Sequence, residues 1–387
     1  MIKDIEIVPI WSSMGNRSVK VVVKTDKGVF SASSPTFLDT GRNEFRHLEV
    51  TQAIKKFHDV KKEFIGMTED DYDIIDDRIN KLGINSIGAN VAACISKACV
   101  KAGGGYKVLK PDAMRFPIPM ANIVSGGIHG GYCSIHSFFV IPRVNTLYEA
   151  VNENYLFWKD VGKMLKERGM ILGRSSEGGW IVHFTDLKTI EFLSHHASQR
   201  NLGIGIDFGG SNLYNRGKYV YDKIGKKFDA GEQLEFVKQF VDRYNVTYVQ
   251  DPFHGNDFEN FSELRKKLKD VVVCGSELYS SQPTRIKRGI SLKSTNGVNL
   301  EIERAGTVSR LVRLVDNIRE VGHVSVLGDR VEETTDDFLA DLAVGSGVDV
   351  LKYGVSGGEH LSKINRLLEI WFDVSSRVTP EMTKLSI

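Results

Sequence analysis

The sequence has few of the features that mark secreted proteins, membrane proteins or proteins with structural metal sites. It holds four cysteines in 387 residues, Cys94, Cys99, Cys133 and Cys274, and none of them has CxxC spacing. Scattered cysteines in apolar runs are typical of reduced thiols, so we expect neither a disulfide framework nor a zinc knuckle. No apolar run approaches the roughly 18 residues of a membrane span, and the first residues lack a signal-peptide core. We therefore expect a cytoplasmic protein that does not enter membranes.

An excess of charge of either sign is also missing. The chain has 51 Lys and Arg residues against 49 Asp and Glu residues, a formal net charge of +2. Such a balance creates no global field that would attract nucleic acid or an anionic membrane. Any recognition of an anion must therefore be local.

The first third of the chain has the pattern of a small α+β unit. Residues 1–31 alternate apolar and polar side chains around turn residues, which predicts a three-stranded meander. Apolar residues then recur at helical spacing between residues 46 and 103, and glycines at 103–105 close the segment. We expect the helices to cover the meander in an N-terminal capping domain over residues 1–110.

The remaining residues, 111–387, have a repeated strand-helix pattern. Short β-branched runs such as 203–207, 246–250 and 271–274 are each followed by a longer helix-like segment, and the pattern continues to residue 352. Nearly continuous apolar strands that alternate with helices favour a closed α/β barrel with parallel strands. The alternative is a doubly wound open sheet, but no GxGxxG motif follows a first strand to support it. In such a barrel, chemistry takes place at the C-terminal ends of the strands.

Several motifs, in order along nearly the whole chain, resemble the enolase (phosphopyruvate hydratase) family. Residues 15–21 resemble its G-N-P-T-V-x-V, and residues 117–129 follow its P-x-P-M-x-N-I-x-N-G-G-x-H. Residues 177–179, 250–253, 341–345 and 352–354 are similar to its E-G-G, E-D-P-F, D-L-x-V-G and K-x-G. The resemblance implies an α+β cap on an eight-stranded α/β barrel, usually dimeric, with Mg²⁺ and no organic cofactor. It implies a reaction in which a lysine takes the proton beside the carboxylate of 2-phosphoglycerate.

The resemblance places the family's metal ligands on three strand ends. Asp207 matches the first carboxylate, although an aspartate there could also be a helix N-cap. The second ligand, a glutamate in the family, is Gln250, and the third, an aspartate, is Ser276. The neighbouring Glu277 replaces the third ligand only if the strand end shifts by one residue. We expect a weakened Mg²⁺ site at Asp207, Gln250 and Glu277.

The residues that carry the family's proton transfers are also changed. Glu301 occupies the position of the lysine base, and Asp329 occupies that of a substrate-binding histidine. Glu177 and Lys352 are kept, while the acid partner of Glu177 falls at Ser137. We take Glu177, Lys352, Glu301 and Asp329 as the candidate catalytic residues.

Three further residues are candidates for substrate binding. Arg330 keeps the family's phosphate-binding arginine, but the serine beside it is Val331. Asp39 takes the place of a metal-binding serine in the family's mobile lid, where Phe37 replaces a glycine. His129 lies in a glycine-rich loop that resembles a second lid, although a solvent-exposed loop histidine is the alternative.

Three hypotheses follow for the function. The first is a diverged enolase-family protein with a rearranged site, which has lost or altered the dehydration of 2-phosphoglycerate and takes another small carboxylate or phosphocarboxylate. The second is a noncatalytic relative with a binding or structural role. The third is a working phosphopyruvate hydratase, which must tolerate Glu301, Gln250 and Ser276 together.

Overall fold

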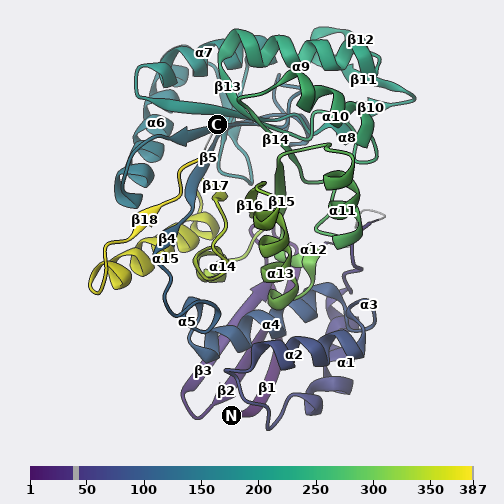
Figure 1. Cartoon of the computed structure of the whole chain (residues 1–387), viewed down its shortest axis with the longest axis vertical. Coiled ribbons are helices and arrows are strands. Elements are labelled where there is room, and N and C mark those ends of the chain that lie inside the picture. The colour runs from purple at the N-terminus through teal and green to yellow at the C-terminus, as the bar shows by residue number, and fades with distance from the viewer. Residues whose placement is uncertain (38–42, 386–387) are drawn as a thin grey trace.

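The computed structural model describes residues 1–37 and 43–385 and divides them between a small sheet-and-helix unit and a barrel (Figure 1). The small unit lies at the purple and blue end of the molecule, and the barrel helices fill the opposite end. Among the described residues, no helix is both long enough and apolar enough to cross a membrane.

The N-terminal unit is a three-stranded antiparallel sheet covered by helices on one face. The strands are β1 (Ile2–Trp11), β2 (Arg17–Thr25) and β3 (Gly28–Ser34), paired in that order. The helices are α1 (Val50–Val60), α2 (Tyr72–Leu82), α3 (Ile84–Ile87), α4 (Ala89–Gly103) and α5 (Tyr106–Leu109). Alternation along β2 buries Val19, Val21 and Val23 against these helices. The predicted meander is confirmed.

Helix α4 is mostly apolar and buried on nearly all sides because it packs on two partners. Its residues are almost all buried, including Ala93, Val100 and Ala102. One face packs on β2 and β3, and the other contacts the barrel helices α12 (Ile302–Ala305) and α13 (Val308–Glu320). A helix that is hydrophobic all round belongs in such a buried position. The division of the chain at residue 110 stays a prediction.

Eight strands form the closed barrel. In order around the ring they are β5 (Ile118–Ser125), β6 (Ser137–Pro142), β9 (Leu202–Asp207), β13 (Val246–Gln250), β14 (Val272–Gly275), β15 (Gly297–Leu300), β16 (Val324–Gly328) and β17 (Val350–Gly354). Parallel pairing of β17 with β5 closes the ring. This closure excludes the open doubly wound sheet.

Helices surround the barrel and fill the segments between strands. The longer ones are α6 (Leu147–Glu167), α7 (Asp186–Ser198), α9 (Ala230–Tyr244), α10 (Phe258–Lys267), α11 (Pro283–Ser291), α13, α14 (Phe338–Ser346) and α15 (Gly358–Ser375). Short hairpins and edge pairs complete the chain: β7 (Ile171–Arg174) with β8 (Trp180–Val182), β10 (Tyr214–Asn215) with β11 (Lys218–Tyr221) and β12 (Lys226–Phe228), and β4 (Arg115–Phe116) with β18 (Glu381–Met382).

One barrel strand, β6, departs from the parallel pattern. It pairs antiparallel with both β5 and β9. The residues between β5 and β6 form only a glycine-rich loop with the 3-10 turn Gly127–His129, too short to return the chain to the other end. The start of β6 therefore lies at the same rim as the ends of its neighbours, and Ser137 is paired with Asp207.

Candidate functional site

The barrel mouth collects polar side chains from most of the strand ends. Asp207 and Gln250 end β9 and β13, and Lys352 lies in β17. All three are largely buried, so their charges and hydrogen bonds are only weakly screened by water. The mouth is therefore an enclosed polar site on an apolar barrel.

Asp207 is held by nitrogen donors. The side-chain Nε2 of Gln250 lies 2.5 Å from Asp207 Oδ2, and the ammonium of Lys352 lies 3.6 Å from the same oxygen. The amide oxygen of Gln250 instead accepts a hydrogen bond from the hydroxyl of Tyr248 at 2.7 Å. Gln250 thus offers N–H groups, not an oxygen, to the position beside Asp207.

The third predicted metal position is hydrogen-bonded to a different set of residues. Ser276 Oγ lies between Asn299 Nδ2 at 3.0 Å and Glu301 Oε1 at 3.4 Å. The backbone N–H groups of Ser276 and Glu277 both donate to the carboxylate of Asp251, at 2.9 and 3.0 Å. These two bonds fix the chain where Glu277 would have to shift.

Glu277 does not reach Asp207 or Gln250. Its carboxylate makes no hydrogen bond or ion pair with residues 1–37 or 43–385, and its Cβ lies beside Gly255. Mg²⁺ prefers several oxygen ligands in octahedral geometry. The set Asp207, Gln250, Ser276 and Glu277 does not fit such an ion, since Gln250 turns its N–H toward Asp207 and the hydroxyl of Ser276 brings no charge.

Glu301 lies in a buried network of ion pairs. Its Oε2 is 2.8 Å from Nη1 of Arg330 and 3.2 Å from Nε of Arg304. Glu44 completes the network, with Arg304 at 2.9 Å and Arg330 at 3.4 Å. Burial tends to raise the pKa of Glu301, but Arg304 and Arg330 outweigh it and hold that pKa below its ordinary value. Glu301 is a carboxylate that two arginines already neutralise.

Asp329 is turned toward the outer wall of the mouth. Its Oδ2 is 2.8 Å from Nδ1 of His360, and the other ring nitrogen of His360 is 2.8 Å from the carbonyl oxygen of Ser176. Acceptors at both nitrogens require a doubly protonated ring. Burial lowers the pKa of His360, yet the bond to Asp329 outweighs it and raises that pKa to about 9. Asp329 and His360 form a buried ion pair.

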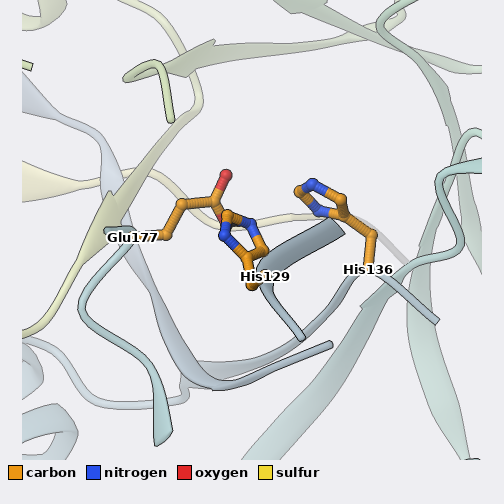
Figure 2. A group of neighbouring side chains, drawn as sticks. All are labelled: His129, His136 and Glu177. Atoms are coloured by element: carbon orange, nitrogen blue, oxygen red, sulfur yellow. Dashed lines mark ion pairs between the residues drawn. The ribbon is translucent and has the colours of Figure 1, made fainter. Parts of the chain in front are cut away.

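Glu177 lies next to two histidines (Figure 2). Its Oε2 accepts hydrogen bonds from Asn122 Nδ2 at 2.8 Å and from Ser137 Oγ at 2.9 Å. Nε2 of His129 is 3.6 Å away, and the rings of His129 and His136 meet edge to face at 4.7 Å. The side chain of His129 is only 4% exposed, so the alternative of a solvent-exposed loop histidine is wrong.

The acid-base groups of the mouth have pKa values far from neutral. Burial alone would raise the pKa of Glu177, but His136, His129 and Lys352 hold it well below its usual range. Burial would lower the pKa of Lys352, but the carboxylates of Asp207, Glu177 and Glu301 raise it above its ordinary value. Effective bases have a pKa near the operating pH. At neutral pH Glu177 is therefore a carboxylate and Lys352 an ammonium.

The lid position predicted at Asp39 lies outside the described residues. Its neighbour Phe37 is described, and the guanidinium of Arg330 stacks on the Phe37 ring at 4.1 Å. This contact ties the retained arginine to the segment that leads into the predicted lid.

Four residues of the mouth were missed by sequence reasoning. His136 directly precedes Ser137, and its spacing from His129 across a glycine-rich loop was a usable signal. Arg304 forms an ion pair with Glu301, Glu44 forms one with Arg304, and His360 pairs with Asp329. These partners come from distant segments, and no local motif marks them.

Comparison with known proteins agrees with this architecture. Residues 113–381 match the family described as enolase, C-terminal TIM barrel domain. A protein named enolase from Archaeoglobus fulgidus is 33% identical over 396 residues, covering 96% of this chain and 97% of the relative. Enolases from Thermoplasma acidophilum and Pyrobaculum aerophilum are each 30% identical and cover 95% of this chain. The family model matches residues 113–381, and the relatives align with at least 95% of this chain. The chain therefore belongs to the enolase family.

Proposed function

We propose that this chain binds a small carboxylate or phosphocarboxylate anion at the barrel mouth and does not dehydrate 2-phosphoglycerate by its family's route. The observation that carries the proposal is the ion pair between Glu301 and Arg330, with 2.8 Å between Oε2 and Nη1. It puts an acid, already bound to an arginine, where the family has its lysine base.

Cationic groups around the mouth support the choice of an anionic ligand. Lys352, Arg330 and Arg304 are all largely buried there, and His129 and His136 face the same space. Buried cations act through a low dielectric, so an incoming carboxylate or phosphate gains more from them than from exposed lysines. The ligand exchanges places with Glu301 or Glu44 as the partner of these arginines.

Two features argue against the family's reaction. A glutamate held by two arginines has a lowered pKa, and a weak base takes the proton beside a carboxylate slowly. The residues at Asp207, Gln250 and Ser276 also present too few oxygens for Mg²⁺. The charge of the dianionic intermediate would then lack most of its stabilisation.

A second candidate is a working phosphopyruvate hydratase, favoured by the name enolase of relatives up to 33% identical to this chain. It would use Lys352 or another group as the base. A noncatalytic role is the third candidate, and it differs from the first in requiring no ligand at the mouth.

Conversion of 2-phosphoglycerate separates the candidates. The purified chain with excess Mg²⁺ is assayed by the ultraviolet absorbance of phosphoenolpyruvate, beside the enolase of Archaeoglobus fulgidus. We expect a rate at least about 10³-fold below that of the relative, the range attributed to a positioned acid or base. A comparable rate that disappears in Lys352→Ala or Asp207→Ala would establish the second candidate instead.

Ligand binding is measured on the same samples. Thermal shifts with phosphoenolpyruvate, 2-phosphoglycerate and unphosphorylated hydroxy acids should reveal stabilisation that Lys352→Ala removes. Lys266→Ala, on an exposed helix face, is the matched control. If none of these anions stabilises the wild-type chain, the noncatalytic role stands.

The remaining family properties belong to the same proposal. We infer a homodimer in the cytoplasm, with residues 1–110 as the capping domain and 111–387 as the barrel domain. Light scattering of the purified chain tests the dimer.

A further inference from the structure

Three side chains of the mouth make a group that the enolase resemblance does not assign to metal binding. His129 comes from the 3-10 turn after β5, His136 directly precedes β6, and Glu177 lies in the turn between β7 and β8. One ligand atom from each lies within 4.8 Å of the others. Figure 2 shows the Glu177 carboxylate beside the His129 ring, with the His136 ring turned toward them.

The nitrogen of His129 that faces this space has no hydrogen-bond partner. Nε2 is buried and unpaired among the described residues, and the His129 side chain is 4% exposed. Burying a polar atom without a partner costs roughly 1–3 kcal/mol. The nearest acceptor, Glu177 Oε2, is 3.6 Å away, which is too far for a hydrogen bond. Nε2 of His129 thus lies without a hydrogen bond beside Glu177 and His136.

The distances between these ligand atoms fit a metal site. Nitrogen and oxygen ligands about 2.1 Å from a tetrahedral ion lie about 3.4 Å apart. The 3.6 Å between Nε2 of His129 and Oε2 of Glu177 is close to this edge. His136 needs only a small ring movement, since its ligand atom is already within 4.8 Å of both others.

Neighbouring residues hold the three side chains in place. Asn122 and Ser137 both donate to Glu177 Oε2, and Oε1 accepts no hydrogen bond from the described residues. Ser137 Oγ is also 3.2 Å from Nδ1 of His136, so one hydroxyl connects two of the side chains. Hydrogen bonds of this kind orient ligands and raise metal affinity.

The chemical types of the three ligands indicate which metal ion the site prefers. Two imidazoles and one carboxylate suit Zn²⁺ and its neighbours Co²⁺ and Ni²⁺, whereas Mg²⁺ prefers oxygen. Three protein ligands leave a fourth position open for water or a ligand oxygen. The carboxylate of Asp207, whose Oδ2 lies 4.0 Å from Nδ1 of His136, adds negative charge nearby, and Lys352 offsets part of it.

We infer that His129, His136 and Glu177 bind one divalent transition-metal ion, of the zinc type, at the barrel mouth. This site is separate from the Asp207, Gln250 and Ser276 positions. This inference can be tested independently of the proposed anion binding, because metal binding is measured without any substrate.

The test is a titration of the chelator-treated protein. Zn²⁺ affinity is measured by competition with a chromogenic chelator, and Co²⁺ binding by its visible absorption. We expect one ion per chain in the wild type and an affinity at least about 100-fold lower in His136→Gln and in His129→Asn, beyond the effect of losing an outer-shell partner. His195→Gln is the matched control, because exposed His195 and half-buried His196 are neighbours on α7 and are available for adventitious binding.

A second comparison fixes the location. Asp207→Asn should keep Zn²⁺ binding within about tenfold of the wild type, since only a neighbouring charge is lost. Binding lost in Asp207→Asn but kept in His136→Gln overturns the assignment, as does an affinity that follows His195. If the histidine variants do not fold, X-ray absorption of the zinc-loaded wild type decides: two imidazoles support the site, and none refutes it.

Discussion

Gln250 donates its side-chain amide to Asp207 across the pairing of β13 with β9, where the two residues are direct neighbours in register. The contact is 2.5 Å, and both side chains are buried. Because the donor is a neutral amide, Asp207 has a partner that does not depend on a metal ion.

Replacing Gln250 with glutamate should create a Mg²⁺-dependent protein. Two buried carboxylates would then face each other at the distance where Asp207 now accepts an N–H. We expect the metal-free variant to lose at least about 1–3 kcal/mol of unfolding free energy, which is the cost of an unpaired buried polar group. Saturating Mg²⁺ should restore most of it, as measured by thermal unfolding with and without the ion.

The double variant Asp207→Asn with Gln250→Glu is the control, since it again has a single carboxylate. Its melting temperature should respond to Mg²⁺ no more than that of the wild type. A Gln250→Glu protein that Mg²⁺ does not stabilise would contradict our account of this contact.

Removing the charge of Glu301 should strengthen anion binding. Glu301→Gln frees Arg330 from its nearer acceptor and Arg304 from one of its two acceptors, leaving Glu44 as their shared partner. We expect the dissociation constant for phosphoenolpyruvate to fall by about tenfold, equivalent to about 1.4 kcal/mol. Calorimetric titration measures it, and Glu44→Gln should have a smaller effect, because Glu44 lies 3.4 Å from Arg330 and Glu301 lies 2.8 Å away. Weaker binding in Glu301→Gln would show that the network, and not the arginines alone, holds the anion.

The ion pair of His360 with Asp329 should make stability depend on pH. The pKa of His360 is raised from 6.5 to about 9 in the folded protein, so its contribution is full below about pH 6.5 and is lost as the pH rises through about 9. Such a shift corresponds to at most about 3 kcal/mol. Glu359, 3.9 Å from the ring, adds to the effect, while Lys363 opposes it.

Urea unfolding at about pH 6 and about pH 9.5 measures this loss in the wild type. His360→Gln keeps a donor toward Asp329 but has no titrating ring, so its stability should change less over the same interval. Equal pH dependence in both proteins would remove His360 as the cause.

Gly105, in the turn between α4 and α5, should tolerate no side chain. Gly105 has φ 65°, and a Cβ there would overlap Oδ1 of Asp341, which accepts two hydrogen bonds, from Tyr106 N and Arg366 Nη2, each at 3.0 Å. Gly105→Ala combines left-handed strain with loss of these bonds, and we expect it to cost roughly 3 kcal/mol or more.

Gly15→Ala is the matched control, since Gly15 has φ 75° but nothing lies within 4 Å of its added Cβ. It should cost only about 1–2 kcal/mol, the price of the left-handed conformation alone. Denaturant unfolding of both variants gives the difference, and equal losses would mean that Asp341 moves aside freely.

The sequence predicted the architecture well because strands and helices repeat with clear periods. The helix-like segment expected after the run 203–207 includes α9, and the expected barrel is closed. The reversed direction of β6 was not predicted, because strand direction depends on the length of the connection and not on the strand itself.

The site was harder to predict than the fold. Sequence position placed Asp207, Gln250 and Lys352 at one mouth, where they lie within hydrogen-bonding or ion-pairing distance. It did not reveal that Gln250 turns its nitrogen toward Asp207, since side-chain orientation depends on Tyr248. Nor did it reveal the arginine network around Glu301, whose members are brought together only by folding.

The pairing of β5 with β17 joins the first barrel strand to the last. During synthesis, β5 emerges early, and its hydrogen-bonding edge stays open until the end of the chain has left the ribosome. Unpaired edges of this kind invite pairing with other chains. A chain truncated just before Val350 should therefore aggregate in the cell, whereas the full chain closes its barrel by pairing β17 with β5.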